Sequence, residues 1–184
     1  MSSIFDYFDA IYCINLSRRS DRWQEVQKEF DKIGIKNKVV RFCAVETPDN
    51  WHIGCMLSHR GILEEAKKNW YKNILVFEDD VKFYWKNEQS LQLIMPFLKE
   101  EKWDLLYLGW YICFWACPAM IDKWNFYQCT WILGTFAIWY SSRIFEKLLE
   151  QIPNSYKESE KFIKKHTAFD LFLWRYIQNQ WRAF

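Results

Sequence analysis

Short apolar runs, each bounded by polar or turn-forming residues, recur along the chain and predict the strands of a buried sheet. These runs are rich in β-branched and aromatic residues and are only seven or eight residues long, which is closer to the usual length of strands (~5–6 residues) than to that of helices. They are AIYCINL (10–16), KVVRFCAV (38–45), NILVFED (73–79), WDLLYLG (103–109) and GTFAIWY (134–140).

The segments between these runs carry apolar residues at helical spacing. Trp23, Val26 and Phe30 mark one face of a first helix, which Gly34 ends. Further helices are predicted at 54–70, within 87–100, at 141–152 with a serine cap, and at 168–181. We expect a polar loop before 54 and a polar connection over 153–166, and we find no period over 110–131. Alternating strands and helices predict a single α/β domain, residues 1–184, with a largely parallel sheet.

Three consecutive acids follow the third predicted strand, and they are the strongest chemical signal in the sequence. Glu78, Asp79 and Asp80 come directly after the apolar run ILVF. Unit charges ~4 Å apart repel by about 1 kcal/mol even in water, and ligands of parallel sheets collect beyond the carboxyl ends of strands. A hard divalent cation, Mg²⁺ or Mn²⁺, would relieve this repulsion and could hold a diphosphate. Alternatively, one acid caps the turn and the others are solvated.

Arginines follow the first predicted strand, where parallel strands would bring them to the same edge as the acids. Arg18 and Arg19 precede the first helix and Arg22 lies in its first turn. A helix amino end is already electropositive, which disfavours cations by ~0.3–1 kcal/mol each. Such a cluster makes more sense if an anion binds there, although solvated loop charges remain an alternative. Together with the acids, the arginines favour a phosphorylated ligand.

Composition narrows the class of protein. The net charge of +2 is too small to indicate a surface that binds nucleic acid. The amino-terminal residues lack the pattern of a secretion signal. No apolar run is long enough to span a bilayer, so we expect a cytoplasmic protein with peripheral membrane contact at most. The six cysteines are then expected to be reduced. Cys113 and Cys117 have the spacing of half a zinc site, but no second pair completes it.

An ordered set of motifs resembles glycosyltransferase family 25, which includes lipooligosaccharide galactosyltransferases and collagen galactosyltransferases. The segments are IYCINLSRRSDRW, VRFCAVE, GCMLSHRGILEEAKKNWYKNILVFEDDV and WDLLYLG, followed more loosely by GTFAIWYSSRIFEKLL and FDLFL. The resemblance implies a GT-A fold, an α/β sandwich that binds a nucleotide sugar. It also implies transfer with inversion from a UDP-sugar, usually UDP-galactose, to a glycan, in biosynthesis of a lipooligosaccharide or a protein-linked glycan, with Mn²⁺ or Mg²⁺.

The resemblance also implies roles for individual residues. The metal-binding acids would be Glu78, Asp79 and Asp80, with Asp80 foremost, and Asp170 would be the general base or would support the site indirectly. The donor nucleotide would lie beside seven further residues, which are Asn15, Leu16, Arg18, Arg22, Gly54, Ser58 and His59.

Two rival functions stay open on the sequence. A nucleotidyl- or phosphotransferase could use the same acids, but no catalytic lysine or second acidic pair stands out near them. A non-catalytic nucleotide- or sugar-binding module on the same fold is the other alternative, because the chain ends soon after Asp170. The region 110–129 matches no part of the family, and its aromatic residues would suit either acceptor selection or packing.

Overall fold

The structure of the protein is a computed structural model. It describes residues 3–83, 96, 99, 103–108, 111–112, 119–121, 126–128, 132–178 and 183. The predicted helix within 87–100 and most of the region 110–131 therefore lie outside the described residues.

A mixed central sheet confirms the predicted α/β fold class. Its five strands, in spatial order, are β2 (Val39–Cys43), β1 (Ala10–Asn15), β3 (Asn73–Glu78), β9 (Ala137–Ser141) and β4 (Leu105–Tyr107). β1 pairs in parallel with both β2 and β3, whereas β9 runs antiparallel between β3 and β4. The sheet is thus mostly parallel, with one reversed strand inserted near its edge. Four two- or three-residue strands form two small ribbons, β5 (Tyr111–Ile112) with β8 (Ile132–Leu133), and β6 (Ala119–Ile121) with β7 (Phe126–Gln128).

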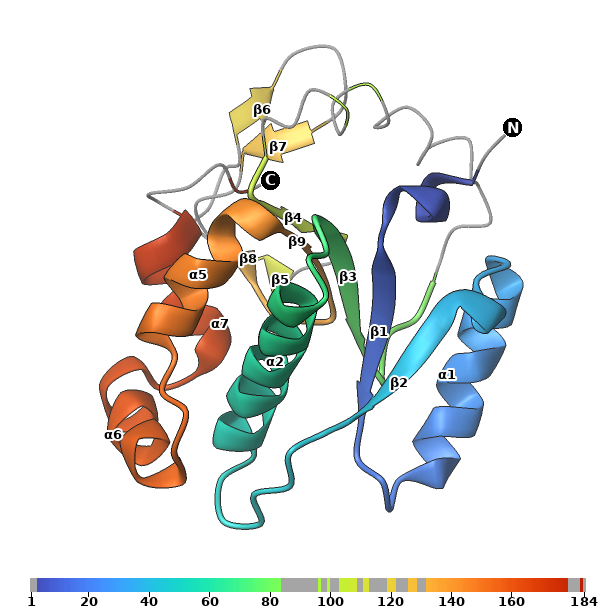
Figure 1. The fold of residues 1–184 in the computed structure, drawn as a ribbon. Coiled ribbons are helices and arrows are strands. Elements are labelled where there is room, and N and C mark those ends of the chain that lie inside the picture. The colour runs from blue at the N-terminus through green and yellow to red at the C-terminus, as the bar shows by residue number, and fades with distance from the viewer. Residues whose placement is uncertain are drawn as a thin grey trace.

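Helices cover both faces of the central sheet (Figure 1). One face packs against α1 (Ser20–Lys32) and an amino-terminal 3-10 helix (Ile4–Tyr7). The other face packs against α2 (Trp51–Lys68), α5 (Ser142–Gln151), α6 (Tyr156–His166) and α7 (Phe169–Phe172), which continues as a π-helical segment (Leu173–Gln178). Each face has its own hydrophobic core, and the sheet separates them.

Strand β3 contributes to both cores because successive side chains of a strand point to opposite faces. Ile74 and Val76 belong to the core beneath α2, and Leu75 and Phe77 belong to the core beneath α1. All four side chains are fully buried. An uninterrupted apolar run is what a strand covered on both faces requires.

One helix boundary and one additional helix differ from the sequence prediction. Helix α2 begins at Trp51, not at 54, because the Asn50 side chain caps it by accepting a hydrogen bond from the His52 backbone N–H at 3.1 Å. The expected polar connection over 153–166 instead contains α6, which Ser155 caps through the Glu158 N–H. Ser141 occupies the cap position of α5, but its side chain makes no capping hydrogen bond.

Candidate functional site

The acids and the arginine turn meet at one edge of the sheet, as the sequence predicts. β1 and β3 are adjacent and parallel, with Ile14 opposite Glu78 in the register. Their carboxyl ends, and the start of helices α1 and α2, lie together at the lower edge in Figure 1. The residues that follow the two strands are therefore neighbours although more than 60 positions separate them in the sequence.

Asp79 is held by the last residue of β1 and by an arginine in the first turn of α1. Its Oδ2 accepts a hydrogen bond from Asn15 Nδ2 at 2.5 Å, and its Oδ1 lies 2.9 Å from an Arg22 guanidinium nitrogen. Only 11% of the Asp79 side chain is exposed. These contacts make Asp79 an anchor between the turn after β3 and the start of α1.

Asp80 shares the Arg22 guanidinium with Asp79 but faces solvent more. Its Oδ2 lies 3.1 Å from Arg22, and 46% of its side chain is exposed. Burial raises the pKa of Asp80 and the charges of Glu78 and Asp79 raise it further, so that the pKa stays above its ordinary value although Arg22 lowers it. The acidic turn therefore keeps an excess of negative charge that Arg22 does not neutralise.

Glu78 leaves the sheet on the other face, toward α2. Its Oε1 accepts a hydrogen bond from the Thr135 hydroxyl and lies 3.7 Å from Cys55 Sγ and 3.9 Å from His59 Nε2. Burial raises the pKa of this carboxyl, but His59, Thr135 and Cys55 more than offset the effect, and the pKa lies below its usual range. These contacts thus favour the ionised form of Glu78, whose side chain is 24% exposed.

The three acids consequently do not share one set of contacts. Glu78 is the last residue of β3 and continues the face of Ile74 and Val76, whereas Asp79 and Asp80 occupy the turn and contact α1. The geometry brings Asp79 and Asp80 together and directs Glu78 toward α2. A single ion held by all three acids stays a prediction.

His59 is fully buried beneath the sheet. Its Nδ1 lies 3.0 Å from the Tyr140 hydroxyl, and its ring packs against Phe169 with centroids 5.2 Å apart. Within the described part of the chain its Nε2 has no hydrogen-bond partner. Nε2, Cys55 Sγ and a Glu78 oxygen all lie within 4.8 Å of one another, an arrangement that could hold a metal ion.

Gly54 and Ser58 fasten α2 to the loop that follows β2. Ser58 Oγ donates to the Gly54 carbonyl at 2.6 Å and accepts from the Val45 N–H at 2.9 Å. A Cβ on Gly54 would lie 2.4 Å from the Val45 carbonyl oxygen and 2.7 Å from Thr47 Oγ1, so only glycine allows this close approach. Both residues shape the wall of the site, and their predicted contact with a nucleotide stays a prediction.

Asp170 lies at the Glu78 side of the site. Its Oδ2 accepts from the Gly134 N–H at 3.0 Å and its Oδ1 from the Leu171 N–H at 2.8 Å. Because Gly134 precedes Thr135, which donates to Glu78, the two carboxylates are linked through one short segment of chain. The two backbone amides thus hold the Asp170 carboxylate in a fixed orientation, and its role as a general base stays a prediction.

The remaining predicted residues lie on the β1–α1 loop. The Leu16 carbonyl accepts from the Arg19 N–H at 2.9 Å and so shapes the turn. Arg18 forms an exposed ion pair with Glu46, at 2.5 Å. Neither contact involves the acidic turn, and the predicted role of both residues at the nucleotide stays a prediction.

Arg41 is a residue that the sequence analysis missed. From β2 its guanidinium donates two hydrogen bonds to Asn15 Oδ1, and it lies over the Trp23 ring, 5.2 Å from the centroid. Asn15 therefore links Arg41 to Asp79, and a second guanidinium flanks the turn. The signal was weak because an arginine inside a predicted strand resembles an ordinary exposed position on an edge strand.

Cys55 and Thr135 were also missed as site residues. Cys55 precedes His59 by one helical turn, so that the two share a face of α2, and this spacing was the available signal. Thr135 reaches Glu78 only because β9 inserts next to β3, which the sequence order does not indicate. Burial and then the Glu78 charge raise the pKa of Cys55 well above its usual range.

A separate hollow of about 450 Å³ lies between α5, α6 and the carboxyl-terminal helices. Aromatic rings of Phe162, Phe172 and Tyr176 line it, together with His166. None of the predicted site residues contributes to its lining, so it does not belong to the site described above.

Comparison with known protein families shows which family the region of this site resembles. The profile of glycosyltransferase family 25 (LPS biosynthesis protein) matches residues 47–121, which include α2 and all three acids. The resemblance to glycosyltransferase family 25 is confirmed. Among the described residues, no helix is long and apolar enough to cross a membrane.

Curated relatives from this family carry both active and inactive names. "Inactive glycosyltransferase 25 family member 3" of Homo sapiens is 29% identical and covers 55% of this chain. "Procollagen galactosyltransferase 1" of Danio rerio is 30% identical over the same share. The match spans only 22% and 21% of these relatives, respectively, so the chain corresponds to about a fifth of their length.

A solved structure shows a weak overall likeness. It is the "crystal structure of a glycosyltransferase involved in the glycosylation of the major capsid of PBCV-1", which aligns over 86% of this chain and 75% of its own at 13% identity. The TM-score is 0.46, and nothing further rests on this likeness.

Proposed function

We propose that this protein binds a UDP-sugar at the edge formed by β1 and β3 and transfers the sugar, a hexose such as galactose, to a glycan acceptor. The acceptor would be an oligosaccharide, a lipid-linked glycan or a protein-linked glycan. Support comes from the family relationship and from relatives named procollagen galactosyltransferases. The observation that carries the proposal is the acidic turn, where Asp79 and Asp80 share the one guanidinium of Arg22.

The residues of the turn fit a hard divalent cation. Asp80 is half exposed and retains uncompensated negative charge, as a ligand of Mn²⁺ or Mg²⁺ should before the ion binds. Glu78 stands two residues earlier, but its Oε1 faces Thr135, Cys55 and His59. Asp79 is engaged by Asn15 and Arg22, and we assign it to positioning the turn. When bound, the ion would supply Lewis-acid stabilisation of the departing diphosphate.

The guanidinium groups of this edge would share the phosphate charge. Arg22 is partly exposed between Asp79 and Asp80, and Arg41 lies on the far side of Asn15. Once the acids bind a cation, Arg22 becomes free to donate to a phosphate oxygen, which is the geometry that arginine favours. Asn15 contacts both Arg41 and Asp79 and so fixes the position of one relative to the other.

Asp170 is the proposed general base for an inverting transfer. Inversion requires a group that accepts the proton of the acceptor hydroxyl on the side of the sugar opposite the leaving diphosphate. The backbone amides of Gly134 and Leu171 hold the Asp170 carboxylate in place. Asp170→Asn should therefore abolish transfer, by about 10²-fold or more, and leave UDP binding intact.

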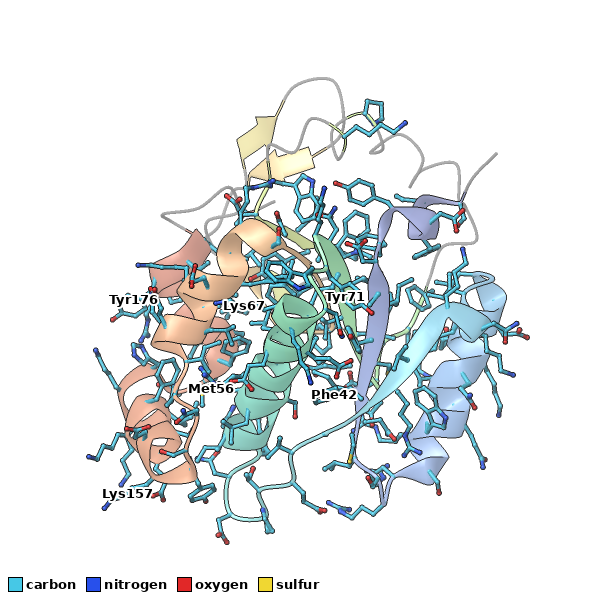
Figure 2. The ribbon with its side chains drawn as sticks, viewed as in Figure 1. Phe42, Met56, Lys67, Tyr71, Lys157 and Tyr176 are labelled. Carbon is cyan, nitrogen blue, oxygen red and sulfur yellow. The ribbon has the colours of Figure 1, made fainter. Side chains whose placement is uncertain are left out.

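Calorimetric titration with UDP, with and without Mn²⁺, tests the proposal. We expect UDP to bind more tightly with Mn²⁺, Asp80→Asn to remove the Mn²⁺ dependence, and Arg22→Met to weaken binding at every Mn²⁺ concentration. Lys67→Met is the matched control, because Lys67 lies toward the opposite end of α2 (Figure 2) and forms an ion pair with the exposed Glu146. Binding without metal dependence, or no binding, would overturn the proposed donor site.

A non-catalytic binding module is the second candidate, and the relatives named as inactive favour it. Incubation with a panel of UDP-sugars and oligosaccharide acceptors separates the two functions. Product formation that Asp170→Asn abolishes establishes an enzyme, whereas Mn²⁺-dependent UDP binding without product or donor hydrolysis establishes a binding module.

A further inference from the structure

Cys55, His59 and Glu78 form a second candidate metal site, on the opposite side of β3 from the Arg22 turn. Their three ligand atoms lie within 4.8 Å of one another. Sγ to Oε1 is 3.7 Å, and Nε2 to Oε1 is 3.9 Å. A tetrahedral zinc ion with bonds of ~2.0–2.3 Å holds its ligand atoms ~3.3–3.7 Å apart. The side chains would need to close by only about 1 Å.

His59 provides the independent sign that a ligand belongs here. The residue is fully buried, and within the described part of the chain Nε2 makes no hydrogen bond. Buried polar nitrogens are almost always paired. Nε2 is directed toward Glu78 and Cys55, where a metal ion would be its partner.

The surrounding hydrogen bonds are those of a metal site. A metal-bound histidine donates its other N–H to a nearby acceptor, and His59 Nδ1 lies 3.0 Å from the Tyr140 hydroxyl oxygen. The Thr135 hydroxyl donates to Glu78 Oε1 and lies 3.8 Å from Cys55 Sγ. Tyr140 and Thr135 would thus orient two of the three ligands.

Charge and ligand type select the metal. A thiolate and a carboxylate together neutralise a divalent ion, which suits a site where His59 is fully buried and Cys55 and Glu78 are partly buried. Thiolate and imidazole ligands favour Zn²⁺ over the hard ions Mn²⁺ and Mg²⁺. On binding, the Cys55 S–H bond breaks, its proton passes to solvent, and a sulfur–metal bond forms.

We propose that Cys55, His59 and Glu78 bind one Zn²⁺ ion, in a site separate from the Mn²⁺ and nucleotide site at Asp80. Three protein ligands leave one position for water or another small ligand. The two sites meet at Glu78, whose Oε1 faces Cys55 and His59. Zinc would therefore link the first turns of α2, which carry Cys55 and His59, to the residue that precedes Asp79 and Asp80.

Titration of the metal-free protein with Co²⁺ tests this proposal, because a cobalt–thiolate bond gives a near-ultraviolet charge-transfer band. We expect one equivalent to bind with that band, and Zn²⁺ to displace it. Cys55→Ser should remove the band, and His59→Gln should weaken binding. Tyr140→Phe should weaken it by about 10–100-fold, the effect of losing a supporting hydrogen bond.

Three controls separate this site from the alternatives. Cys43→Ser alters an exposed cysteine and should leave the titration unchanged. Asp80→Asn should keep the cobalt band while it removes Mn²⁺-dependent UDP binding, so the two proposals can fail separately. A band that disappears in the Cys113→Ser/Cys117→Ser protein and persists in Cys55→Ser would place the metal elsewhere and overturn the proposal.

Either tautomer of His59 in the metal-free protein is compatible with the proposal, because the imidazole proton exchanges between Nδ1 and Nε2 and the Tyr140 hydroxyl can act as donor or acceptor. A wild-type protein that binds no Co²⁺ with a thiolate band at neutral pH would overturn the proposal.

Discussion

At the scale of single residues, charge decides what the edge of the sheet can do. Asp79 and Asp80 are adjacent and contact the same guanidinium, yet Asp79 is nearly enclosed and Asp80 is half exposed. The enclosed carboxylate holds the turn through Asn15 and Arg22. The exposed one retains the repulsion, which is the property that a cation-binding site needs and that folding alone would not favour.

Asp80→Asn should therefore stabilise the protein when no divalent cation is present. The folded-state pKa of Asp80 lies above the ordinary value of about 3.9. Between these two values the folded state binds more protons, so stability falls as pH rises through this window. Asparagine removes that penalty, and because Asp80 is half exposed we expect a gain of at most about 1 kcal/mol at pH 7.

Urea unfolding at several pH values measures this effect. The advantage of Asp80→Asn should be present at pH 7 and should shrink as the carboxyl becomes protonated on acidification. Asp21 is a control of opposite sign, because a hydrogen bond from Arg19 lowers its pKa to about 2. Its favourable contribution is present above the unfolded pKa and is lost as pH falls toward 2. Asp21→Asn should thus lose stability at pH 7, and a gain there would contradict this account.

The sequence predicts which residues lie at this edge of the sheet. It does not predict which of the acids points to which face. The ends of the predicted strands and their parallel order are enough to predict that the acids and Arg22 lie close together. The split between Glu78 and Asp79 depends on where β3 ends and the turn begins. A change of one residue in that boundary would send each carboxylate to the other face, and pattern analysis does not resolve single residues at strand ends.

At the scale of elements, the fit between α2 and the preceding loop shapes one wall of the site. Gly54 allows the helix to touch the Val45 carbonyl, and Ser58 ties the same loop through two hydrogen bonds. This contact sets where the buried end of α2, with Cys55 and His59, stands relative to β3.

Gly54→Ala should destabilise the protein by about 1–3 kcal/mol, the usual cost of overpacking. The new Cβ would meet a backbone oxygen at 2.4 Å, which cannot move without displacing the loop from the helix. Gly61→Ala on the same helix is the matched control, since its Cβ would meet only the far end of the Phe42 ring, at 2.9 Å. Phe42 lies between β2 and α2 (Figure 2).

Urea unfolding of both variants gives the comparison. Because a side chain can rotate away more easily than a carbonyl can, Gly61→Ala should cost clearly less than Gly54→Ala. Equal costs would show that helix propensity, and not the contact with Val45, determines the effect at position 54.

The main strands and most helices follow from local pattern, whereas two features do not. The run GTFAIWY predicts a strand, but its antiparallel place between β3 and β4 depends on long-range pairing. Helix α6 was missed because only Ser159, Ile163 and His166 are buried among its lysines and glutamates. A stripe this narrow and polar resembles a connection, and tertiary packing makes it a helix.

At the scale of the whole molecule, β3 joins two hydrophobic cores that the sheet otherwise separates. One core lies beneath α2, α5 and the carboxyl-terminal helices, and the other lies beneath α1. The two proposed metal sites likewise lie on opposite sides of the end of β3. Cooperative unfolding of the two faces therefore determines whether binding at one site changes the stability of the other.

Ile74→Ala and Leu75→Ala test that cooperativity, because these neighbours are fully buried in opposite cores. Each should cost about 2–5 kcal/mol. If the chain unfolds as one unit, both variants shift the same transition whether it is followed by far-ultraviolet circular dichroism or by tryptophan fluorescence. Trp103 and Trp139 are buried in the core that contains Leu75. Their fluorescence is separated from that of the other ten tryptophans by subtracting the signal of the Trp103→Phe/Trp139→Phe protein, and the difference reports on that face.

The decisive comparison is the fluorescence of Ile74→Ala, in which the altered side chain and the reporting tryptophans lie on opposite faces. A fluorescence midpoint that moves as far as the circular dichroism midpoint means that β3 transmits the loss across the sheet, as two-state unfolding requires. A midpoint that stays in place would mean that the two cores unfold separately. Val40→Ala, on the exposed side of β2, should change stability by no more than about 0.5 kcal/mol. Coupling across β3 would make Zn²⁺ at Cys55 and UDP at Asp80 stabilise the same folded state, so that each ligand would raise the midpoint reported by either probe.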